Sequence, residues 1–310
     1  MKFALFLGCN IPARVMQYES ASRAILGKLN VGVVDIKEFN CCGYPLRNIN
    51  FKTFVLLAAR NLALAEGDGL DIMTLCQCCF GSLKKAHHLL KEDALLRNEV
   101  NSHLEKEGLR YKGGIEVKHL LQVLYHDVGI VALQKEIKQT YEGLHIAAHY
   151  GCHILRPSQL VQFDDPVSPT LFDQLIEITG AQSIYWPMRL ECCGAPLCGM
   201  NDELSMDLSK KKLESGRQMG AEYVCVACPY CHLQFDTVQE RMRAEKRMGD
   251  RLPSILYPQL LGLCMGIKGR TLGLEINRIP LDGIEDFLSE SREEPRAEAS
   301  YEKGARRNVA

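Results

Sequence analysis

The chain has 310 residues, of which 46% are hydrophobic and 24% are charged, and its formal net charge is −1. This length allows two ordinary domains, and the balanced charge gives no reason to expect binding to nucleic acid or to an anionic membrane surface. No apolar run approaches the roughly 18–20 residues of a membrane helix. The apolar stretch at residues 3–7 is shorter than the core of an export signal, about 7–15 residues. We therefore expect a cytoplasmic globular protein without a membrane span.

Fourteen cysteines are an unusually large number for a chain of this length. An exported protein would use them for disulfides, but the chain shows no export signal and is long enough to build a core without such links. We therefore expect the cysteines to ligate a metal or to carry out redox chemistry.

Short apolar runs alternate with helical patterns along the whole chain. The expected strands are at 2–7, 31–36 and 71–75, then at 145–149, 183–186 and 223–226; the expected helices are near 18–29, 53–66 and 83–90, then at 170–179 and 203–219. Alternation of this kind predicts parallel α/β sheets of the doubly wound type.

The two halves of the chain repeat one cysteine pattern. A single cysteine, a Cys-Cys-Gly motif and a CxxC motif occur twice in the same order, with 31 and 39 residues in the first gap and 33 and 34 in the second. We therefore expect a first module at 1–138, a second module at 139–288 and a charged tail at 289–310, with the linker near 134–143. The tail is expected to be solvated; the alternative is an arm that docks a partner protein.

Ten cysteines belong to the repeat, five in each copy. They are Cys9, Cys41, Cys42, Cys76 and Cys79 in the first copy, and Cys152, Cys192, Cys193, Cys228 and Cys231 in the second. Each block follows an expected strand, and loops at the carboxyl edge of a parallel sheet meet at one place. Structural zinc needs only four ligands, and adjacent cysteines suit a multinuclear iron–sulfur cluster better. Zinc in one copy remains the alternative.

Four further cysteines have no counterpart in the other copy. Cys225 and Cys264 lie in apolar runs and are expected in the core. Cys78 and Cys198 lie inside the cysteine loops, either as bystanders or as an additional ligand or redox thiol.

Two histidines flank Cys152, and they are the candidate catalytic residues. His149 and His153 stand where the first copy has Phe6 and Asn10. Such a histidine could supply a proton near neutral pH or, equally, tune a cluster through hydrogen bonds. His232 is a weaker candidate. Four arginines near the cysteine loops could bind an anionic substrate: Arg14, Arg47, Arg156 and Arg189.

At these motifs the chain resembles the CCG-domain iron–sulfur proteins, the family that includes the B subunit of heterodisulfide reductase. The resemblance is carried by 6–9, 76–83, 149–153 and 228–236; Cys78 and Cys198 depart from the family pattern. It implies two pseudo-symmetric Rossmann-like CCG modules and two noncubane [4Fe–4S] clusters with a disulfide cleaved between them. It also implies two partners, a flavin protein like the A subunit of that enzyme and a ferredoxin-type iron–sulfur protein like its C subunit.

The expected function is the reduction of a disulfide, and the resemblance implies a substrate of the coenzyme M–coenzyme B type or an analogue. The sequence contains no nucleotide or flavin fingerprint, so electrons must come from another protein. The main alternative is an electron-relay subunit of another oxidoreductase, of the glycolate- or lactate-oxidising type. A structural zinc scaffold is a further alternative.

Overall fold

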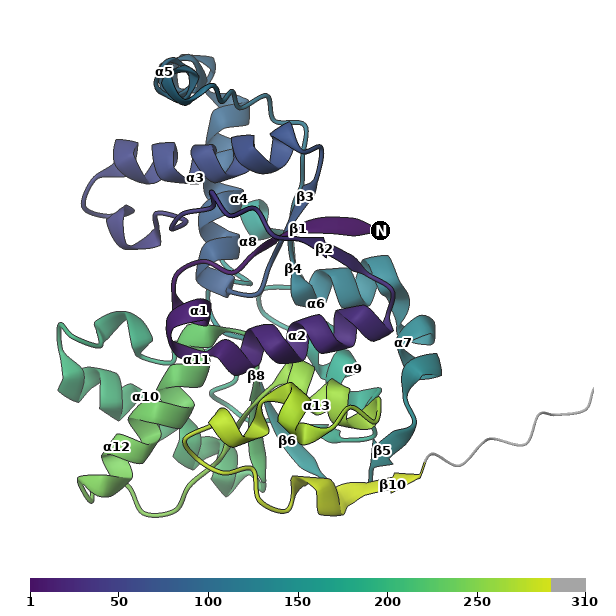
Figure 1. Ribbon diagram of the computed structural model, residues 1–310. Helices are drawn as coiled ribbons and strands as arrows, with labels where there is room; N and C mark the ends of the chain where they lie inside the picture. Colours follow the sequence, from purple (N-terminus) through teal and green to yellow (C-terminus); the bar gives the residue numbers. More distant parts are fainter. Residues whose placement is uncertain (291–310) are drawn as a thin grey trace, which may run out of the picture.

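Two four-stranded parallel sheets, one in each half of the chain, form the framework of the structure (Figure 1), a computed structural model that describes residues 1–290. The strand orders are β2-β1-β3-β4 and β7-β6-β8-β9, and they coincide when strands are matched in chain order. The first sheet contains β1 (Lys2–Phe6), β2 (Gly32–Val34), β3 (Asp71–Thr74) and β4 (Val117–His119). The second contains β6 (His145–His149), β7 (Gln182–Ile184), β8 (Tyr223–Val226) and β9 (Ser254–Leu256). The predicted duplicated parallel α/β fold is therefore confirmed.

All six predicted strands are present, and each sheet has one further strand that the sequence did not predict. β4 and β9 have only three residues each, which is too short for a periodic pattern to show. Their pairing with β3 and β8 is parallel. β2 is also shorter than the predicted strand at 31–36.

The helices of the first half cover its sheet. They are α1 (Asn10–Arg14), α2 (Met16–Lys28), α3 (Phe51–Gly67), α4 (Gln77–Glu92), α5 (Ala94–Leu104), α6 (Leu120–Gln122) and α7 (Ile130–Glu136), with short helical turns η1 (Tyr44–Leu46), η2 (Glu105–Glu107) and the π-helical η3 (Val123–Gly129). α4 begins well before the predicted start at residue 83, because Cys76 is its N-cap. The first CxxC motif therefore lies in the first turn of a helix.

The helices of the second half follow the same plan. They are α8 (Ser158–Val161), α9 (Leu171–Glu177), α10 (Asp202–Gln218), α11 (Pro229–Leu233), α12 (Gln239–Ala244), α13 (Tyr257–Cys264) and α14 (Gly269–Leu272), with turns η4 (Ala195–Leu197), η6 (Leu274–Ile276), η7 (Ile284–Phe287) and the π-helical η5 (Gln234–Val238). Cys228 is the N-cap of α11, as Cys76 is of α4.

An asparagine N-cap starts the helix that follows each Cys-Cys-Gly loop. Asn50 accepts a hydrogen bond from the backbone N–H of Thr53, and Asn201 accepts one from Leu204, both at 3.1 Å. These caps satisfy one of the free N–H groups at the start of α3 and of α10. The two helices therefore begin at the same distance from the cysteines in both halves.

The glycine of each Cys-Cys-Gly motif has a backbone conformation that other residues rarely adopt. Gly43 has φ +80° and Gly194 has φ +89°. An added Cβ would lie 2.9 Å from the carbonyl oxygen of Phe54 at Gly43, and 2.5 Å from that of Ser205 at Gly194. The loop thus packs directly against the backbone of α3 or α10, which only glycine allows.

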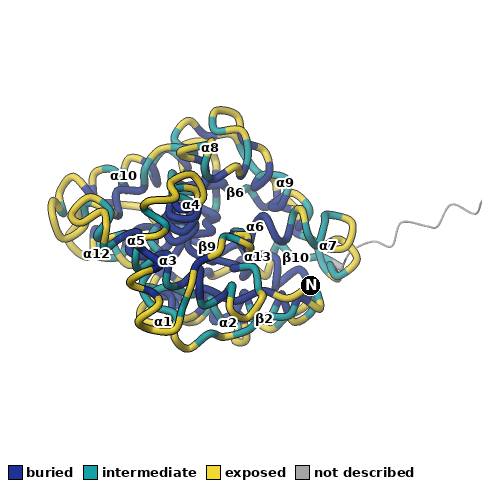
Figure 2. The backbone as a smooth tube through the Cα atoms, turned by 90° about the horizontal axis from the view of Figure 1, so that it is seen from above, coloured by how far each residue is buried: buried dark blue, intermediate teal, exposed yellow. Residues whose placement is uncertain are grey.

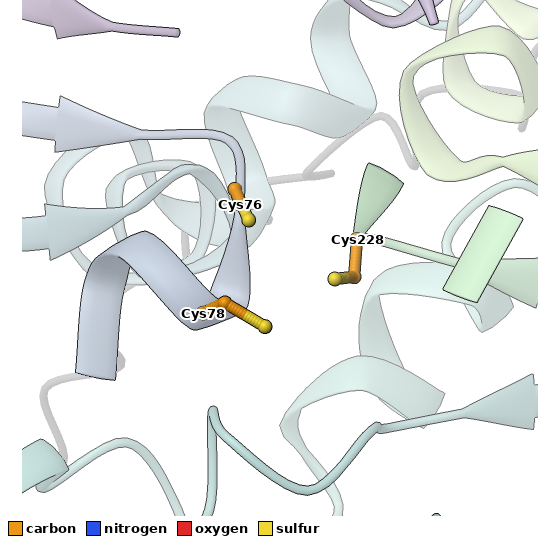
Figure 3. A group of neighbouring side chains, drawn as sticks. All are labelled: Cys76, Cys78 and Cys228. Atoms are coloured by element: carbon orange, nitrogen blue, oxygen red, sulfur yellow. The ribbon is translucent and has the colours of Figure 1, made fainter. Parts of the chain in front are cut away.

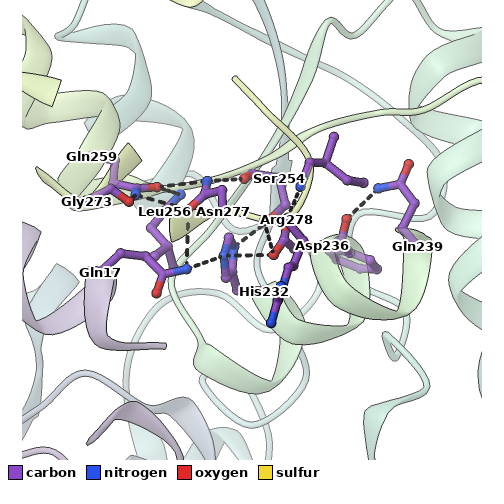
Figure 4. Close-up of polar contacts among 12 residues, drawn as sticks. Gln17, His232, Asp236, Gln239, Ser254, Leu256, Gln259, Gly273, Asn277 and Arg278 are labelled. Atoms are coloured by element: carbon purple, nitrogen blue, oxygen red, sulfur yellow. Dashed lines mark hydrogen bonds and ion pairs between the residues drawn. The ribbon is translucent and has the colours of Figure 1, made fainter. Parts of the chain in front are cut away.

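The two halves are joined by helices and by buried polar contacts. α2 packs against α13 and α14, and α8 of the second half packs against α4 of the first (Figure 1). The buried segments gather around α4, β6 and β9 in the centre, with exposed turns outside (Figure 2). Gln17 from α2 contacts Nε2 of His232 at 3.2 Å and donates to Asn277 at 3.3 Å (Figure 4). His232 therefore belongs to a hydrogen-bonded network between the halves.

The segments at the predicted module boundaries lie side by side. β5 (Gln139–Tyr141) pairs antiparallel with β10 (Leu288–Glu290). The first two residues of the predicted tail thus belong to a strand, and residues 291–310 lie outside the described residues. Within residues 1–290, every helix is too short or too polar to cross a bilayer.

Gly194→Ala is expected to destabilise the fold more than Gly220→Ala. Both glycines have φ near +90°, but nothing lies within 4 Å of a Cβ added at Gly220. Gly220→Ala should cost about 1 kcal/mol for the left-handed backbone alone, and Gly194→Ala about 1–3 kcal/mol more for overpacking. Denaturant unfolding of both variants under anaerobic conditions measures the difference; equal losses would contradict the role of Gly194 in loop packing.

Candidate metal centre

Every cysteine block of the repeat follows the carboxyl end of a strand, as predicted, and each CxxC motif forms the start of the helix that comes next. The single cysteines follow β1 and β6, the Cys-Cys-Gly motifs follow β2 and β7, and the CxxC motifs follow β3 and β8. The two central strands are β1 and β3 in the first sheet and β6 and β8 in the second. The chain leaves each central strand toward the outer strand on its own side, so the loops after the two central strands lead in opposite directions. Loops separate at such a switch point and leave a crevice. The fold thus brings three cysteine loops together in each half.

The five cysteines of the first half, the first set, form a continuous series of sulfur contacts. Cys41 hydrogen-bonds to Cys9 and to Cys42, Cys42 also contacts Cys79, and Cys79 contacts Cys76. Cys9 is exposed and Cys41 is half-buried, whereas the others are buried. The first set therefore runs from the surface into the centre of the protein.

The five cysteines of the second half, the second set, repeat this order. Cys192 hydrogen-bonds to Cys152 and to Cys193, and Cys231 contacts both Cys193 and Cys228. The sulfur atoms of Cys193 and Cys231 are 3.5 Å apart. All fourteen cysteines are free, and none is in a disulfide.

Cys78 connects the two sets. Its sulfur hydrogen-bonds to Cys228 and to Cys76, and the three sulfur atoms lie within 4.8 Å of one another. Figure 3 shows Cys76 and Cys78 on the segment that opens α4, facing Cys228 across the junction of the halves. The residue at the corresponding position of the second CxxC motif is Tyr230. Cys78 is thus a central thiol, and not a peripheral one.

Cys198 has a different position from Cys78. It is exposed and hydrogen-bonds to the Asp202 carboxylate at the start of α10. Cys225 and Cys264 are buried in the core, as predicted.

The protonation of the thiols fits a site for several metal ions. Hydrogen bonds from Cys42 and Cys9 lower the pKa of Cys41 to about 2, and those from Cys152 and Cys193 lower the pKa of Cys192 to about 2. In return, the hydrogen bond with Cys41 raises the pKa of Cys42 to about 12, and the one with Cys192 raises the pKa of Cys193 to about 12. One thiolate in each pair therefore hinders ionisation of the next, and a complete set of thiolates requires the positive charge that metal ions supply. Five donors per set fit a multinuclear cluster and exceed the four ligands of zinc.

A small cavity of about 20 Å³ lies at the junction of the two sets. This is room for a single water molecule, so the cavity could enclose only the reacting atoms of a larger substrate. Among the described residues that line it are Cys78 and four members of the second set, and none belongs to the first set; the remaining lining residues are Tyr44, Gln77, His153, Ala195, Pro196 and Tyr230. The second set therefore borders the cavity.

His153 lines this cavity, and Tyr44 from the first half holds its ring. The Tyr44 hydroxyl lies 3.2 Å from Nε2 of His153. The guanidinium of Arg47 stacks over the Tyr44 ring at 5.2 Å. Burial lowers the pKa of His153, the Arg47 charge lowers it further, and Cys228 and Cys192 raise it. His153 is therefore a mainly neutral imidazole with a fixed orientation.

His149 contacts the second set of cysteines but does not line the cavity. It is fully buried, and its Nε2 lies 3.3 Å from the sulfur of Cys231. Nε2 and the sulfur atoms of Cys193 and Cys231 all lie within 4.8 Å of one another. Burial holds the pKa of His149 well below its usual value, so the ring is neutral and touches a cysteine sulfur.

The arginines differ in their relation to the cavity. Arg47 lies beside Tyr44 and His153. Arg189 is engaged with Asp173 at 3.4 Å and with the Pro169 carbonyl at 3.3 Å. Arg14 borders a separate groove with Gln17 and Arg278, and Arg156 is exposed.

Sequence reasoning missed two tyrosines and a lysine near the sulfur atoms. Tyr44 and Tyr230 line the cavity. Their positions in the sequence could have indicated this, because Tyr44 directly follows Cys-Cys-Gly and Tyr230 lies inside CxxC. Lys212 is buried behind the second Cys-Cys-Gly loop. An alignment of the two copies could have identified Lys212, because it places Lys212 at the position of Asn61.

Comparison with known proteins finds relatives that are named as reductase subunits or as similar to one. It is 36% identical over 282 residues to the B subunit of the ferredoxin/F420H2-dependent CoB–CoM heterodisulfide reductase of Methanosarcina acetivorans, covering 90% of this chain and 94% of that protein. It is 35% identical to a protein of Archaeoglobus profundus that is named as similar to the heterodisulfide reductase B subunit, and the match covers 86% of this chain and 91% of that protein. It is 32% identical to the 8-methylmenaquinol:fumarate reductase membrane anchor subunit of Wolinella succinogenes, and the match covers 90% of this chain and 97% of that protein.

A solved structure shares the fold. The crystal structure of a hypothetical protein from Helicobacter pylori superposes with a TM-score of 0.74 at 19% identity, over 91% of this chain. This chain spans about half of that one, 53%. The likeness shows the fold alone.

The family model for the CCG cysteine-rich domain matches twice, at residues 3–84 and 146–236. These matches cover both sets of five cysteines. Together with the relatives, they show that this chain belongs to the CCG cysteine-rich domain family, with heterodisulfide reductase B subunits among its relatives.

Proposed function

We propose that this chain holds two iron–sulfur clusters, one on each set of five cysteines, and reduces a disulfide at the cavity beside the second set. The observation that carries the proposal is the position of Cys78, which contacts Cys76 of the first set and Cys228 of the second and, with His153, lines a cavity beside the second set. A zinc scaffold would use only four of the five thiols in each half and would leave this cavity without a purpose.

Cleavage of the sulfur–sulfur bond takes two electrons and two protons and releases two thiols. When bound, the clusters would supply the electrons one at a time. The ten cysteines of the two sets would hold them as thiolates. The sequence contains no nucleotide fingerprint, so we propose a ferredoxin-type iron–sulfur protein, itself reduced by a flavin protein, as the donor.

The residues around the cavity would position the disulfide and protonate its products. His153 would donate a proton to a released thiolate, because its ring borders the cavity and Tyr44 fixes its direction. Arg47 would attract an anionic group of the substrate to the mouth of the cavity, at the Tyr44 side. His149 would act through the sulfur of Cys231, since it does not reach the cavity.

The names of the relatives support a reductase and define the alternative. Two relatives are named as B subunits of heterodisulfide reductase or as similar to them, which favours a disulfide of the coenzyme M–coenzyme B type or an analogue. A third is named as part of a quinol:fumarate reductase, which favours the relay role. A relay passes electrons between partners and needs no cavity beside a cluster.

Disulfide reduction by the isolated chain distinguishes these roles. With a chemically reduced low-potential dye as donor under anaerobic conditions, the protein should convert the coenzyme M–coenzyme B heterodisulfide to thiols, which a thiol reagent measures. NADH should not replace the dye, because the nucleotide fingerprint is missing. A protein whose clusters accept electrons from the dye but that releases no thiol from this or related disulfides would be a relay.

Substitution of individual cysteines should separate ligands from the central thiol. Anaerobic wild-type protein should contain roughly eight irons with equal sulfide if both clusters have four irons. Cys76→Ser and Cys152→Ser should each lower the content to roughly four irons, whereas Cys78→Ser, two residues from Cys76 and also buried, should keep all of them. Iron and sulfide analysis measures this; stoichiometric zinc in place of iron would refute the cluster proposal.

His153→Asn should keep both clusters and slow turnover by about 10²–10⁴-fold, the usual range for a lost general acid. Since the pKa of His153 lies below its ordinary value, its protonated fraction grows as pH falls below 6.5. Wild-type turnover should therefore rise toward lower pH, and His153→Asn should lose this rise. Tyr44→Phe, which removes only the orienting hydroxyl, should lie between the two. Near-wild-type turnover of His153→Asn at every pH would show that the ring is not the acid.

A further inference from the structure

The two sets differ in the residue behind their Cys-Cys-Gly loops. Asn61 on α3 and Lys212 on α10 each stand eleven positions after the asparagine that caps the helix. Both side chains are buried, with 0% and 1% exposed. They occupy the same place in the two halves, but one is a neutral amide and the other an ammonium group.

Asn61 holds its loop through uncharged hydrogen bonds. Its Nδ2 donates to the Cys41 carbonyl at 3.2 Å and to Oδ1 of Asn40 at 2.9 Å. Its Oδ1 accepts from the backbone N–H of Asn40 at 2.9 Å. The loop of the first set is thus stabilised without a charge.

Lys212 makes the corresponding contacts with a cation. Its Nζ donates to the carbonyls of Met188 and of Glu191, the latter at 3.0 Å, and lies 4.8 Å from the centre of the Trp186 ring. Burial lowers the pKa of Lys212 to about 8, while Cys193, Cys231, Glu191 and Cys192 raise it. The ammonium group is therefore protonated at neutral pH, close to the sulfur atoms of the second set.

A second difference lies at the last residue of the first strand of each half. β1 ends at Phe6, whose ring packs on Phe39 with centroids 5.1 Å apart. β6 ends at His149, whose Nε2 contacts the Cys231 sulfur at 3.3 Å. The first set thus has aromatic carbon where the second has a hydrogen-bonding ring.

Both differences would raise the reduction potential of a cluster at the second set. Reduction adds negative charge, and a buried cation stabilises that charge strongly because the interior screens it little. Hydrogen bonds to the sulfur atoms also favour the reduced form and raise the potential. At the first set the corresponding residues are Asn61, which carries no charge, and Phe6, whose ring cannot hydrogen-bond to sulfur.

We infer that Lys212 and His149 raise the reduction potential of the second-set cluster above that of the first-set cluster. The inference rests on the two clusters of the proposed function. Electrons would then enter at the first set, whose Cys9 is exposed, and collect at the second set, which borders the cavity. Lys212 and His149 are in this view residues that tune the second site and do not touch the substrate.

The test is an anaerobic redox titration followed by electron paramagnetic resonance. The Cys152→Ser and Cys76→Ser chains, which should keep only the first-set and only the second-set cluster, assign the two signals. In the wild type the second-set cluster should reduce at the higher potential. Lys212→Met removes the charge and keeps most of the side-chain volume; it should lower the ratio of reduced to oxidised second-set cluster at least tenfold at a fixed potential, about 59 mV for one electron.

Two further variants complete the test. Lys212→Arg retains the charge and should leave the ratio within about threefold of wild type, equivalent to about 30 mV. His149→Phe installs the residue of the first half and should shift the second-set cluster in the same direction as Lys212→Met, with the first-set cluster unchanged. If Lys212→Met fails to assemble its cluster, His149→Phe and the wild-type order of potentials decide.

The outcomes separate this inference from the proposed function. Wild-type protein without iron would overturn the proposed function, and the inference with it. Two clusters of equal potential, or a second-set cluster that does not shift in Lys212→Met and His149→Phe, would overturn the inference alone. Disulfide reduction could still take place in that case.

Discussion

The mutual repulsion of neighbouring thiolates is the constraint on which the rest of this structure depends. Eleven cysteines, the two sets and Cys78, form one series of contacts through the centre of the protein. They cannot all ionise without positive charge between them. The two parallel sheets, the glycine loops packed on α3 and α10, and the asparagine caps together hold these sulfur atoms in place, an arrangement that suits a cationic cofactor.

The duplicated fold supplies this scaffold twice, and function is expected where the copies differ. The differences lie close to the sulfur atoms: Cys78 corresponds to Tyr230, Asn10 to His153, and Asn61 to Lys212. The parts that hold the loops, such as the two caps and the two glycines, are unchanged. The duplication therefore preserves the geometry of each site while the surroundings assign different chemistry to the two.

Sequence alone predicts most of the fold and the candidate ligands, because both depend on local patterns. Cysteine spacing and strand–helix alternation identify both sets of cysteines and six of the eight strands in the two parallel sheets. The contact of Cys78 with Cys228 could not be predicted, since it arises from packing between the halves and has no local signature. Lys212 was missed for a similar reason: a lysine on a polar helix is normally solvated, and this one is buried against Trp186 and the carbonyls of Met188 and Glu191. β4 and β9 are too short to produce a periodic pattern.

The position of the cavity bears on whether the two sites do the same work. An electron relay gains nothing from a cavity beside one of its centres, and a symmetric reductase would open the cavity to both sets. Here the cavity is lined by Cys152, Cys193, Cys228 and Cys231, and among its described lining residues the first half contributes Cys78 but no member of the first set. A protein that receives electrons and reduces a substrate needs one centre that a donor can reach and one centre that the substrate can reach. In the function we propose, the first set, with Cys9 at the surface, would receive the electrons, and the second set, which borders the cavity, would meet the substrate.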